Sequence, residues 1–294
     1  MTEPIPPRPS ASLTGKVAVV TGAGAAPGAI GNGRATAILL AEAGCAVVCV
    51  DLKLSLAEET VEMIEADGLG HGVAMVADVT KAEDCQRIVD LALSTYGRLD
   101  ILVNNVGVMG AKGSAVEVDL DGFMDGLRIN VASMVQMAKV AIPAMAANAG
   151  PCAGSIVNMS SVAGLRGGTP HLLYPTSKGA IVNMTRAMAA NHAAQRIRVN
   201  CVCPGMVYTP MMYQNGSGMS RAEREARKAR SLLQTEGNGW DVGAAVRFLA
   251  SDLARWVTGV VLPVDAGTTA ATGVGMQGLH TSNLMHGTEP KGVS

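Results

Sequence analysis

Three side chains, Ser161, Tyr174 and Lys178, have types and a spacing that suit proton transfer at a substrate oxygen. Tyr174 and Lys178 stand at i and i+4, so a helix would place them on one face. An unperturbed phenol has a pKa of about 10 and is a poor base near neutrality, whereas a nearby ammonium favours the phenolate and would lower that pKa. Ser161 would polarise the same oxygen. The Y-x-x-x-K spacing is weak alone, because such pairs arise by chance in many helices, so the prediction depends on the surrounding elements.

Seven short apolar runs alternate with helical patterns along the chain. The runs are nearly free of charge and read as strands at 17–21, 46–50, 73–77, 101–104, 155–159, 198–202 and 260–264. Helices are expected near 34–43, 55–66, 82–96, 119–147, 175–195 and 241–252. Strands covered on both faces and separated by helices indicate a parallel sheet. We therefore predict a single α/β domain, a Rossmann-like doubly wound parallel seven-stranded sheet with helices on both faces.

A glycine-rich turn joins the first strand to the first helix. Gly22, Gly24, Gly28, Gly31 and Gly33 crowd residues 22–33. Glycines let the backbone approach a pyrophosphate, and the following helix N-terminus favours negative charge.

The second strand is followed by a carboxylate at Asp51, which would accept both ribose hydroxyls of an adenosine and repel a 2′-phosphate. The nearby cations Lys53 and Arg34 read as ordinary surface residues. The cofactor expected is NAD, with NADP the alternative.

Composition narrows the class of protein. The formal net charge of −1 gives no electrostatic argument for nucleic acid or an anionic membrane as a partner. The start of the chain shows no apolar signal region. The uncharged stretch 140–165 contains Pro143 and Pro151, which argue against a membrane span. The six cysteines lack metal-ligand spacing, so we expect structural thiols, no metal and a cytoplasmic location.

The expected organisation is a flexible N-terminal arm at 1–12, the Rossmann-fold domain at 13–268 and a C-terminal extension at 269–294. Residues 205–238 interrupt the β/α alternation and suit a lid over the substrate, which we call the lid segment. Its charged run at 221–230 reads as a solvated helix face.

These motifs together resemble the short-chain dehydrogenase/reductase family over about residues 13–268. The resemblance is carried by TG at 21–22, DV at 78–79, NNVG at 104–107, INV at 129–131, SS at 160–161, YPTSK at 174–178, PGMVYT at 204–209 and VDAG at 264–267. It implies a catalytic tetrad of Asn130, Ser161, Tyr174 and Lys178. In such enzymes the Tyr is the acid/base, the Lys lowers its pKa and binds the nicotinamide ribose, the Ser orients the substrate, and the Asn holds a water.

The resemblance also implies a set of residues that contact the cofactor. They are Gly22, Gly31, Asn32, Gly33, Asp51, Asp78, Val79, Asn105, Gly107, Tyr174, Lys178, Pro204, Val207 and Thr209. Two features depart from the family pattern. Eight residues separate Gly22 from Gly31, which indicates a five-residue insertion in the turn, and Val106 replaces the usual Ala.

The substrate pocket is expected along the segments that follow NNVG, the catalytic Ser and PG. The candidates are Met109, Leu165, His171, Met206, Tyr208 and Met212. This apolar, adaptable lining favours a neutral, fairly hydrophobic secondary alcohol or ketone, such as a ring alcohol or a dihydrodiol. His171 reads as a structural polar group, because the tetrad already supplies a proton route.

The leading hypothesis is thus an NAD-dependent oxidoreductase acting on a secondary alcohol. An NADPH-linked carbonyl reductase and a non-catalytic NAD-binding regulatory or structural protein remain alternatives. A homo-oligomer, with a tetramer favoured by the resemblance, is the expected assembly.

Overall fold

The computed structural model describes residues 7–66, 68, 70–213 and 218–271. These residues form one seven-stranded parallel sheet with the order β3-β2-β1-β4-β5-β6-β7. The strands are β1 (Val17–Thr21), β2 (Ala46–Asp51), β3 (His71–Val76), β4 (Ile101–Asn104), β5 (Gly154–Met159), β6 (Ile197–Pro204) and β7 (Val261–Val264). The predicted fold class and all seven predicted strands are confirmed. Strands such as β1 and β5 are buried along their whole length, which is why they read as uncharged runs.

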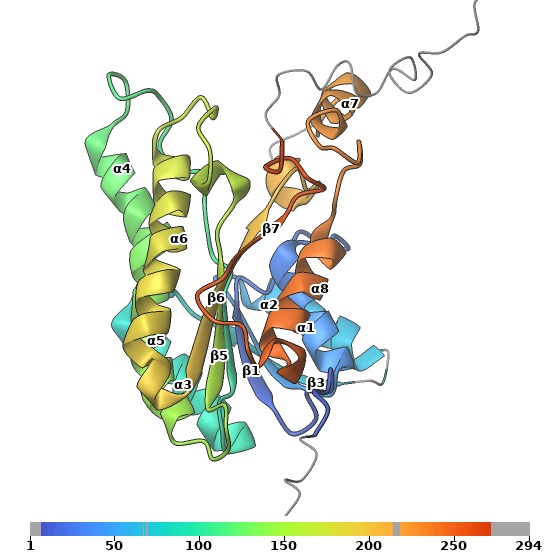
Figure 1. Cartoon of the computed structure of the whole chain (residues 1–294), viewed down its shortest axis with the longest axis vertical. Coiled ribbons are helices and arrows are strands. Elements are labelled where there is room, and N and C mark those ends of the chain that lie inside the picture. The colour runs from blue at the N-terminus through green and yellow to red at the C-terminus, as the bar shows by residue number, and fades with distance from the viewer. Residues whose placement is uncertain (1–6, 67, 69, 214–217, 272–294) are drawn as a thin grey trace, which may run out of the picture.

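Helices cover both faces of the sheet. On one face lie α1 (Asn32–Glu42), α2 (Leu54–Ala66) and α8 (Gly239–Ala250), and on the other lie α3 (Ala82–Tyr96), α4 (Leu120–Leu127), α5 (Ser133–Ala146) and α6 (Leu173–His192) (Figure 1). Each layer has its own apolar cluster against the sheet. The helix α7 (Arg221–Lys228) belongs to the lid segment and lies beyond the end of the sheet (Figure 1).

One predicted helix is interrupted. The continuous helix expected over 119–147 is instead α4, a π-helical turn at Arg128–Ala132 and α5. A π turn inserts one extra residue into a helix and is often found at functional sites. Here it carries Asn130, which is fully buried. The hydrophobic pattern alone cannot show such an insertion, because the apolar residues continue through it.

The segment Leu120–Ala146 is the one helical stretch in the described residues that is long and apolar enough to cross a membrane. Its apolar side chains also have an ordinary explanation. Met134, Met137, Ala141 and Met145 are at most 2% exposed because they pack in the core beside the sheet. The length and composition of Leu120–Ala146 are therefore weak evidence for a membrane span.

The sheet also determines where the predicted site residues meet. The strand order reverses between β1 and β4, and in open α/β sheets a ligand binds at that point, beyond the carboxyl ends of the strands. Residues of the predicted arm at 7–12 are exposed and lack regular structure. Most of the predicted C-terminal extension, residues 272–294, lies outside the described residues.

Candidate active site

A cavity of about 1080 Å³ opens at the carboxyl ends of the strands. All fourteen predicted cofactor residues line it, and so does the predicted catalytic residue Ser161. These residues come from the ends of β1 to β6, from the first turn of α1 and from the first two turns of α6. The fold therefore brings together side chains that are separated by more than half of the chain.

The turn after β1 needs glycine at two positions for different reasons. Gly22 has φ of +64°, a conformation that side-chain-bearing residues rarely adopt. A Cβ added to Gly33 would lie 1.9 Å from the carbonyl oxygen of Gly22. The amide of Asn105 donates to that same carbonyl at 2.9 Å and so holds the turn from the end of β4. This close packing fixes the backbone on which a pyrophosphate would lie.

The insertion in the turn is held by Arg34, and here the sequence interpretation is wrong. Arg34 was expected at the surface, but it is fully buried on α1. Its guanidinium donates to the carbonyls of Ala25 at 3.2 Å and Ala29 at 2.8 Å, and to the carboxylate of Glu59 at 2.7 Å. Glu59 in turn accepts from the backbone N–H of Gly28 at 2.7 Å. The inserted residues supply acceptors for a buried cation, which explains why the insertion has a defined shape.

The remaining groups at this end fit an adenosine dinucleotide. The Asp51 carboxylate lies at the cavity wall, where it accepts from the N–H of Gly24 at 3.0 Å. Carboxylate oxygens have further lone pairs for ribose hydroxyls. The Asn32 Oδ1 atom, also at the cavity, is buried and has no hydrogen-bond partner among the described residues. An orphaned buried oxygen at a helix N-terminus indicates a missing donor, as a bound ligand would supply.

The catalytic candidates Ser161, Tyr174 and Lys178 meet at the other end of the cavity. Ser161 and Tyr174 both line the cavity at this end. The ammonium of Lys178 lies 5.6 Å from the centre of the Tyr174 ring and donates to the carbonyl of Met159 at 2.9 Å. The predicted shared helix face is confirmed, because α6 carries both residues.

Burial controls the proton affinities of this pair. It raises the pKa of Tyr174 above its ordinary value, and the Ser161 side chain opposes that rise only in part. It lowers the pKa of Lys178 to about 8, because the charged ammonium has lost its water. The lowered tyrosine pKa expected from the sequence is therefore wrong for the free protein. Desolvation is the largest cause of the raised pKa of Tyr174.

Close approach of two backbones brings Ser161 to Tyr174. A Cβ on Gly164 would lie 2.5 Å from the carbonyl carbon of Lys178, so only glycine allows the loop after β5 to touch α6. The hydroxyl of Ser160 donates to the carbonyl of Lys178 at 2.7 Å. This contact is tertiary and has no signature in the sequence beyond the glycine itself.

Asn130 does not line the cavity. Its side chain accepts from the N–H of Val108 at 2.8 Å and donates to the carbonyl of Val108 at 2.9 Å and to the hydroxyl of Ser177 at 3.0 Å. It therefore joins the loop after β4 to α6, directly beside Lys178. The water-holding role that the resemblance implies for Asn130 stays a prediction.

The substrate end of the cavity matches half of its predicted lining. Met109, Met206 and Met212 line it as expected. Leu165, His171 and Tyr208 do not. Leu165 packs against an apolar cluster. His171 accepts from the N–H of Gly113 at 3.1 Å, as a structural polar group would.

Tyr208 is turned toward α7. Its ring lies 3.9 Å from the guanidinium carbon of Arg224 and 5.0 Å from the ring centre of Tyr213. On an irregular segment the direction of a side chain depends on its neighbours, and here a stacked cation draws the ring away from the cavity.

Several cavity residues were missed by the sequence prediction. Arg227 and Arg230 from the lid segment and Thr268 and Thr269 after β7 all line it. The composition of the charged run 221–230 predicts a solvated helix face and does not show which arginines turn inward. Arg166 also lines the cavity and donates to the carbonyls of Thr268, Thr269 and Ala271.

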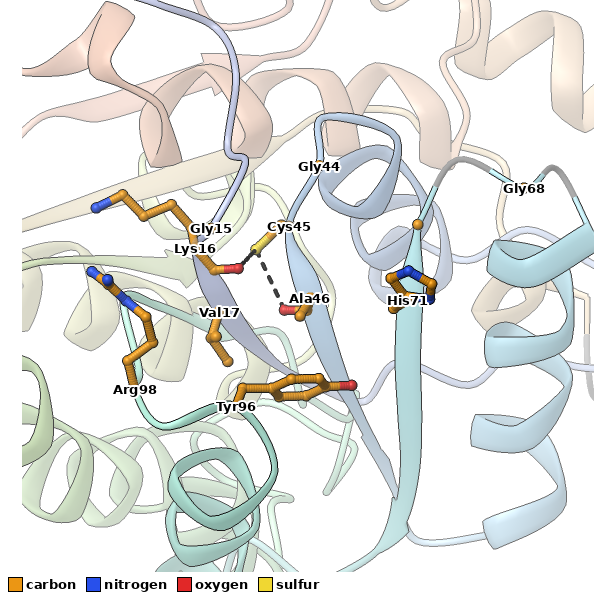
Figure 2. Close-up of a pocket in the computed structure, with 11 residues that line it drawn as sticks. Gly15, Lys16, Val17, Gly44, Cys45, Ala46, Gly68, His71, Tyr96 and Arg98 are labelled. Carbon is orange, nitrogen blue, oxygen red and sulfur yellow. Dashed lines mark hydrogen bonds between the residues drawn. The ribbon is translucent and has the colours of Figure 1, made fainter.

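A second cavity of about 330 Å³ lies at the opposite, amino ends of β1 to β3 (Figure 2). Its cations Lys16 and Arg98 both bind Asp100, at 3.1 and 2.7 Å. The thiol of Cys45 donates to the carbonyls of Lys16 and Ala46, and burial raises its pKa (Figure 2). None of the predicted site residues line this cavity, so the chemistry belongs to the larger one.

Comparisons with known proteins agree with this geometry. The family model described as enoyl-(acyl carrier protein) reductase matches residues 24–269. The 2-(S)-hydroxypropyl-CoM dehydrogenase 3 of Xanthobacter autotrophicus is 38% identical over 88% of this chain and 98% of its own. The cyclohexanol dehydrogenase of an Acinetobacter species is 34% identical over 89% of this chain and 98% of its own.

Solved structures are similar as well. A 7α-hydroxysteroid dehydrogenase in complex with NADH and 7-oxo glycochenodeoxycholic acid superposes with a TM-score of 0.79, at 31% identity over 87% of this chain and 95% of its own. A Burkholderia xenovorans protein described as a short-chain dehydrogenase/reductase reaches 0.81, at 38% identity over 88% of this chain and 98% of its own.

Fold and site together define a Rossmann-type oxidoreductase with a nicotinamide cofactor. The chain belongs to the short-chain dehydrogenase/reductase family and interconverts an alcohol and its carbonyl compound.

Proposed function

We propose that this enzyme is an NAD-dependent dehydrogenase of a neutral, fairly hydrophobic secondary alcohol, with Tyr174 as general acid/base. The observation that carries the proposal is the meeting of Ser161, Tyr174 and Lys178 on one wall of the cavity that the glycine-rich turn and Asp51 complete. A bound nicotinamide dinucleotide would supply the hydride acceptor. Side chains of the protein would position the substrate and transfer the proton.

In the oxidation direction, the alcohol loses a hydride from carbon and a proton from oxygen. Ser161 would hold the substrate oxygen next to the Tyr174 hydroxyl, since both residues line the same cavity. Tyr174 would take the proton as a phenolate and return it during reduction. Since burial raises the pKa of Tyr174 in the free protein, the positive charge of Lys178 becomes more important as water leaves the closed site.

NAD is favoured over NADP by two observations. The Asp51 carboxylate occupies the place where ribose hydroxyls are expected and would repel a 2′-phosphate. The buried Arg34 is directed to the inserted turn and to Glu59, and it does not line the cavity. Its guanidinium is therefore unavailable to a 2′-phosphate. We expect kcat/KM for NAD to exceed that for NADP, and Asp51→Asn to narrow the difference. A strong preference for NADP would refute this use of Asp51 and favour the carbonyl-reductase alternative.

The substrate class follows from the methionines at the cavity. Met109, Met206 and Met212, joined by Met211, provide apolar and adaptable contacts. The name of the Acinetobacter relative, cyclohexanol dehydrogenase, agrees with a ring alcohol. A screen of NAD reduction over cyclic, aromatic and aliphatic secondary alcohols and dihydrodiols tests the proposal. Activity confined to short, charged hydroxy acids would contradict it.

The variant Tyr174→Phe distinguishes a catalytic enzyme from a protein that only binds the dinucleotide. This change removes the hydroxyl and keeps the ring. We expect turnover to be abolished and NADH binding, measured by fluorescence titration, to stay within about twofold of wild type. Equal trace activity in both proteins would favour a non-catalytic binding protein.

We further propose a cytoplasmic homo-oligomer, with a tetramer favoured. All six cysteines are free thiols, which suits a reducing compartment. The helical stretch of α4 and α5 exposes Leu120, Met124 and Val135 at 71%, 63% and 49%, as a subunit interface would. Sedimentation velocity tests the assembly, and a monomer at micromolar concentration would contradict it.

A further inference from the structure

The carboxylate of Glu236 is nearly buried at the base of the lid segment. Its side chain is 3% exposed, although it stands in an irregular stretch just before α8. A buried carboxylate is costly unless charged donors surround it. Glu236 meets that requirement with two arginines from α7 and no others among the described residues.

The two arginines bind opposite oxygens of the carboxylate. Arg224 donates through Nε and Nη2 to Oε2, at 2.8 and 2.6 Å. Arg227 donates through Nε to Oε1 at 3.1 Å. Charge-assisted hydrogen bonds of this type are stronger than neutral ones and also restrict the orientation of the two groups. Glu236 therefore sets the position of α7 along its last two turns.

Each arginine then reaches the segment that follows β6. Arg227 donates through Nη2 to the carbonyl of Val207 at 2.9 Å, and Arg224 stacks on the ring of Tyr208 at 3.9 Å. The backbone next to Glu236 contacts the same segment. The N–H of Tyr208 donates to the carbonyl of Gly237 at 2.8 Å, and the N–H of Gly237 donates to the carbonyl of Met206 at 3.2 Å.

The segment held in this way is part of the cavity wall. Residues 204–207 and 209–212 line the cavity, including three methionines of the substrate end. Arg227, 13% exposed at its side chain, lines it too. One buried carboxylate thus connects α7, the backbone of Val207 and the wall that faces cofactor and substrate.

We propose that Glu236 is a positioning residue of the active site, acting through Arg224 and Arg227 to hold residues 206–212 against the bound cofactor and alcohol. The proposal rests on the assignment of the large cavity to cofactor and substrate. It does not depend on which alcohol is oxidised. Glu236 does not line the cavity, and its effect passes through the two guanidinium groups.

The test compares Glu236→Gln with Glu225→Gln. Glu225 lies on α7 itself, is 58% exposed and, in the described part of the chain, forms an ion pair only with Lys228, at 2.8 Å. Its substitution is therefore a matched loss of one carboxylate. For Glu236→Gln we expect binding of the dinucleotide to weaken by about tenfold, as for loss of a hydrogen bond to a charged group. We also expect KM for the alcohol to rise while kcat at saturation changes by less than about threefold. Glu225→Gln should match wild type in all three quantities.

Three further measurements separate positioning from a general loss of stability. Dinucleotide binding is measured with both NADH and NADPH, so the result does not depend on the preferred cofactor. Glu236→Asp keeps the charge and should recover part of the binding. When Arg227→Met is added to Glu236→Gln, we expect little further loss of dinucleotide binding. Both changes break the same connection between Glu236 and residues 206–212.

The proposal is overturned if Glu236→Gln binds dinucleotide and alcohol as wild type does, or if only its thermal midpoint falls. It is also overturned if the effects of Glu236→Gln and Arg227→Met are additive. A preference for NADPH, or the absence of secondary-alcohol oxidation in wild type, would instead contradict the proposed function and leave these binding comparisons valid.

Discussion

The buried ammonium of Lys178 makes a definite prediction about how stability depends on pH. Lys178 is 3% exposed, and burial lowers its pKa from the ordinary 10.5 to about 8. Below about pH 8 the lysine is charged in both the folded and the unfolded chain, and the folded state carries the full desolvation cost. Between about 8 and 10.5 the folded chain releases the proton while the unfolded chain keeps it. The free energy of unfolding contributed by this residue therefore rises with pH across that window.

The size of the effect follows from the two pKa values. A change of one in pKa is worth about 1.4 kcal/mol, so a fall from 10.5 to about 8 corresponds to about 3 kcal/mol. Lys178→Met replaces the ammonium with an apolar side chain that does not titrate. We expect the stability of Lys178→Met relative to wild type to be greatest near pH 7 and to decline by about 3 kcal/mol as the pH approaches 10.5. The lost hydrogen bond to the Met159 carbonyl adds an offset that does not vary with pH.

Urea unfolding, followed by tryptophan fluorescence at several pH values between about 7 and 10, measures this difference. Comparing the two proteins at each pH cancels the titration of all other groups. Lys139→Met is the control, because Lys139 is exposed on α5, and its curve should run parallel to wild type. If the free energy of unfolding of Lys178→Met also differed from that of wild type by a constant amount across this pH range, within about 1 kcal/mol, the desolvation of the Lys178 ammonium would be refuted.

Three further predictions concern the cofactor turn and the lid. Gly33→Ala should lose dinucleotide binding in a fluorescence titration or fail to fold, because its Cβ would lie 1.9 Å from the carbonyl oxygen of Gly22. Arg34→Met should lower the free energy of unfolding by about 3 kcal/mol in urea, since it leaves Glu59 and several buried carbonyls without their donor. Tyr208→Phe should change KM for the alcohol by less than about twofold in steady-state kinetics, because the ring faces Arg224 and not the cavity.

Matched variants make these outcomes decisive. Gly179→Ala would place its Cβ 3.5 Å from the carbonyl oxygen of Gly164, an ordinary contact away from the cavity lining, and should bind dinucleotide normally. Lys53→Met removes an exposed cation near Asp51 and should unfold like wild type. Normal dinucleotide binding by Gly33→Ala would contradict the packing of the turn, and equal unfolding of Arg34→Met and Lys53→Met would contradict the buried brace. A large rise in KM for Tyr208→Phe would show that Tyr208 contacts the substrate, as the sequence predicts.

The candidate site was predictable where it depends on the strands. Parallel strands all end at the same edge, so residues such as Asp51, the last of β2, and Asn105, which follows β4, must meet there. The i and i+4 spacing on α6 likewise requires Tyr174 and Lys178 to share a face. For these residues, local periodicity and the rules of parallel-sheet topology are sufficient.

Irregular segments were not predictable in the same way. Leu165, His171 and Tyr208 stand on loops, where nothing in the local pattern decides which way a side chain points. Tyr208 turns outward because Arg224, sixteen positions later, offers its guanidinium.

By itself, then, the sequence determined the order of strands and helices, the edge of the sheet that binds a ligand and the residue types that meet there. The tertiary structure alone decided the burial of Arg34, the π turn at Asn130, the proton affinities of Tyr174 and Lys178 and the inward face of α7. The physical reason is the range of the forces involved. Hydrophobic periodicity and helix spacing act between near neighbours, whereas desolvation and buried ion pairs depend on groups that only folding brings together.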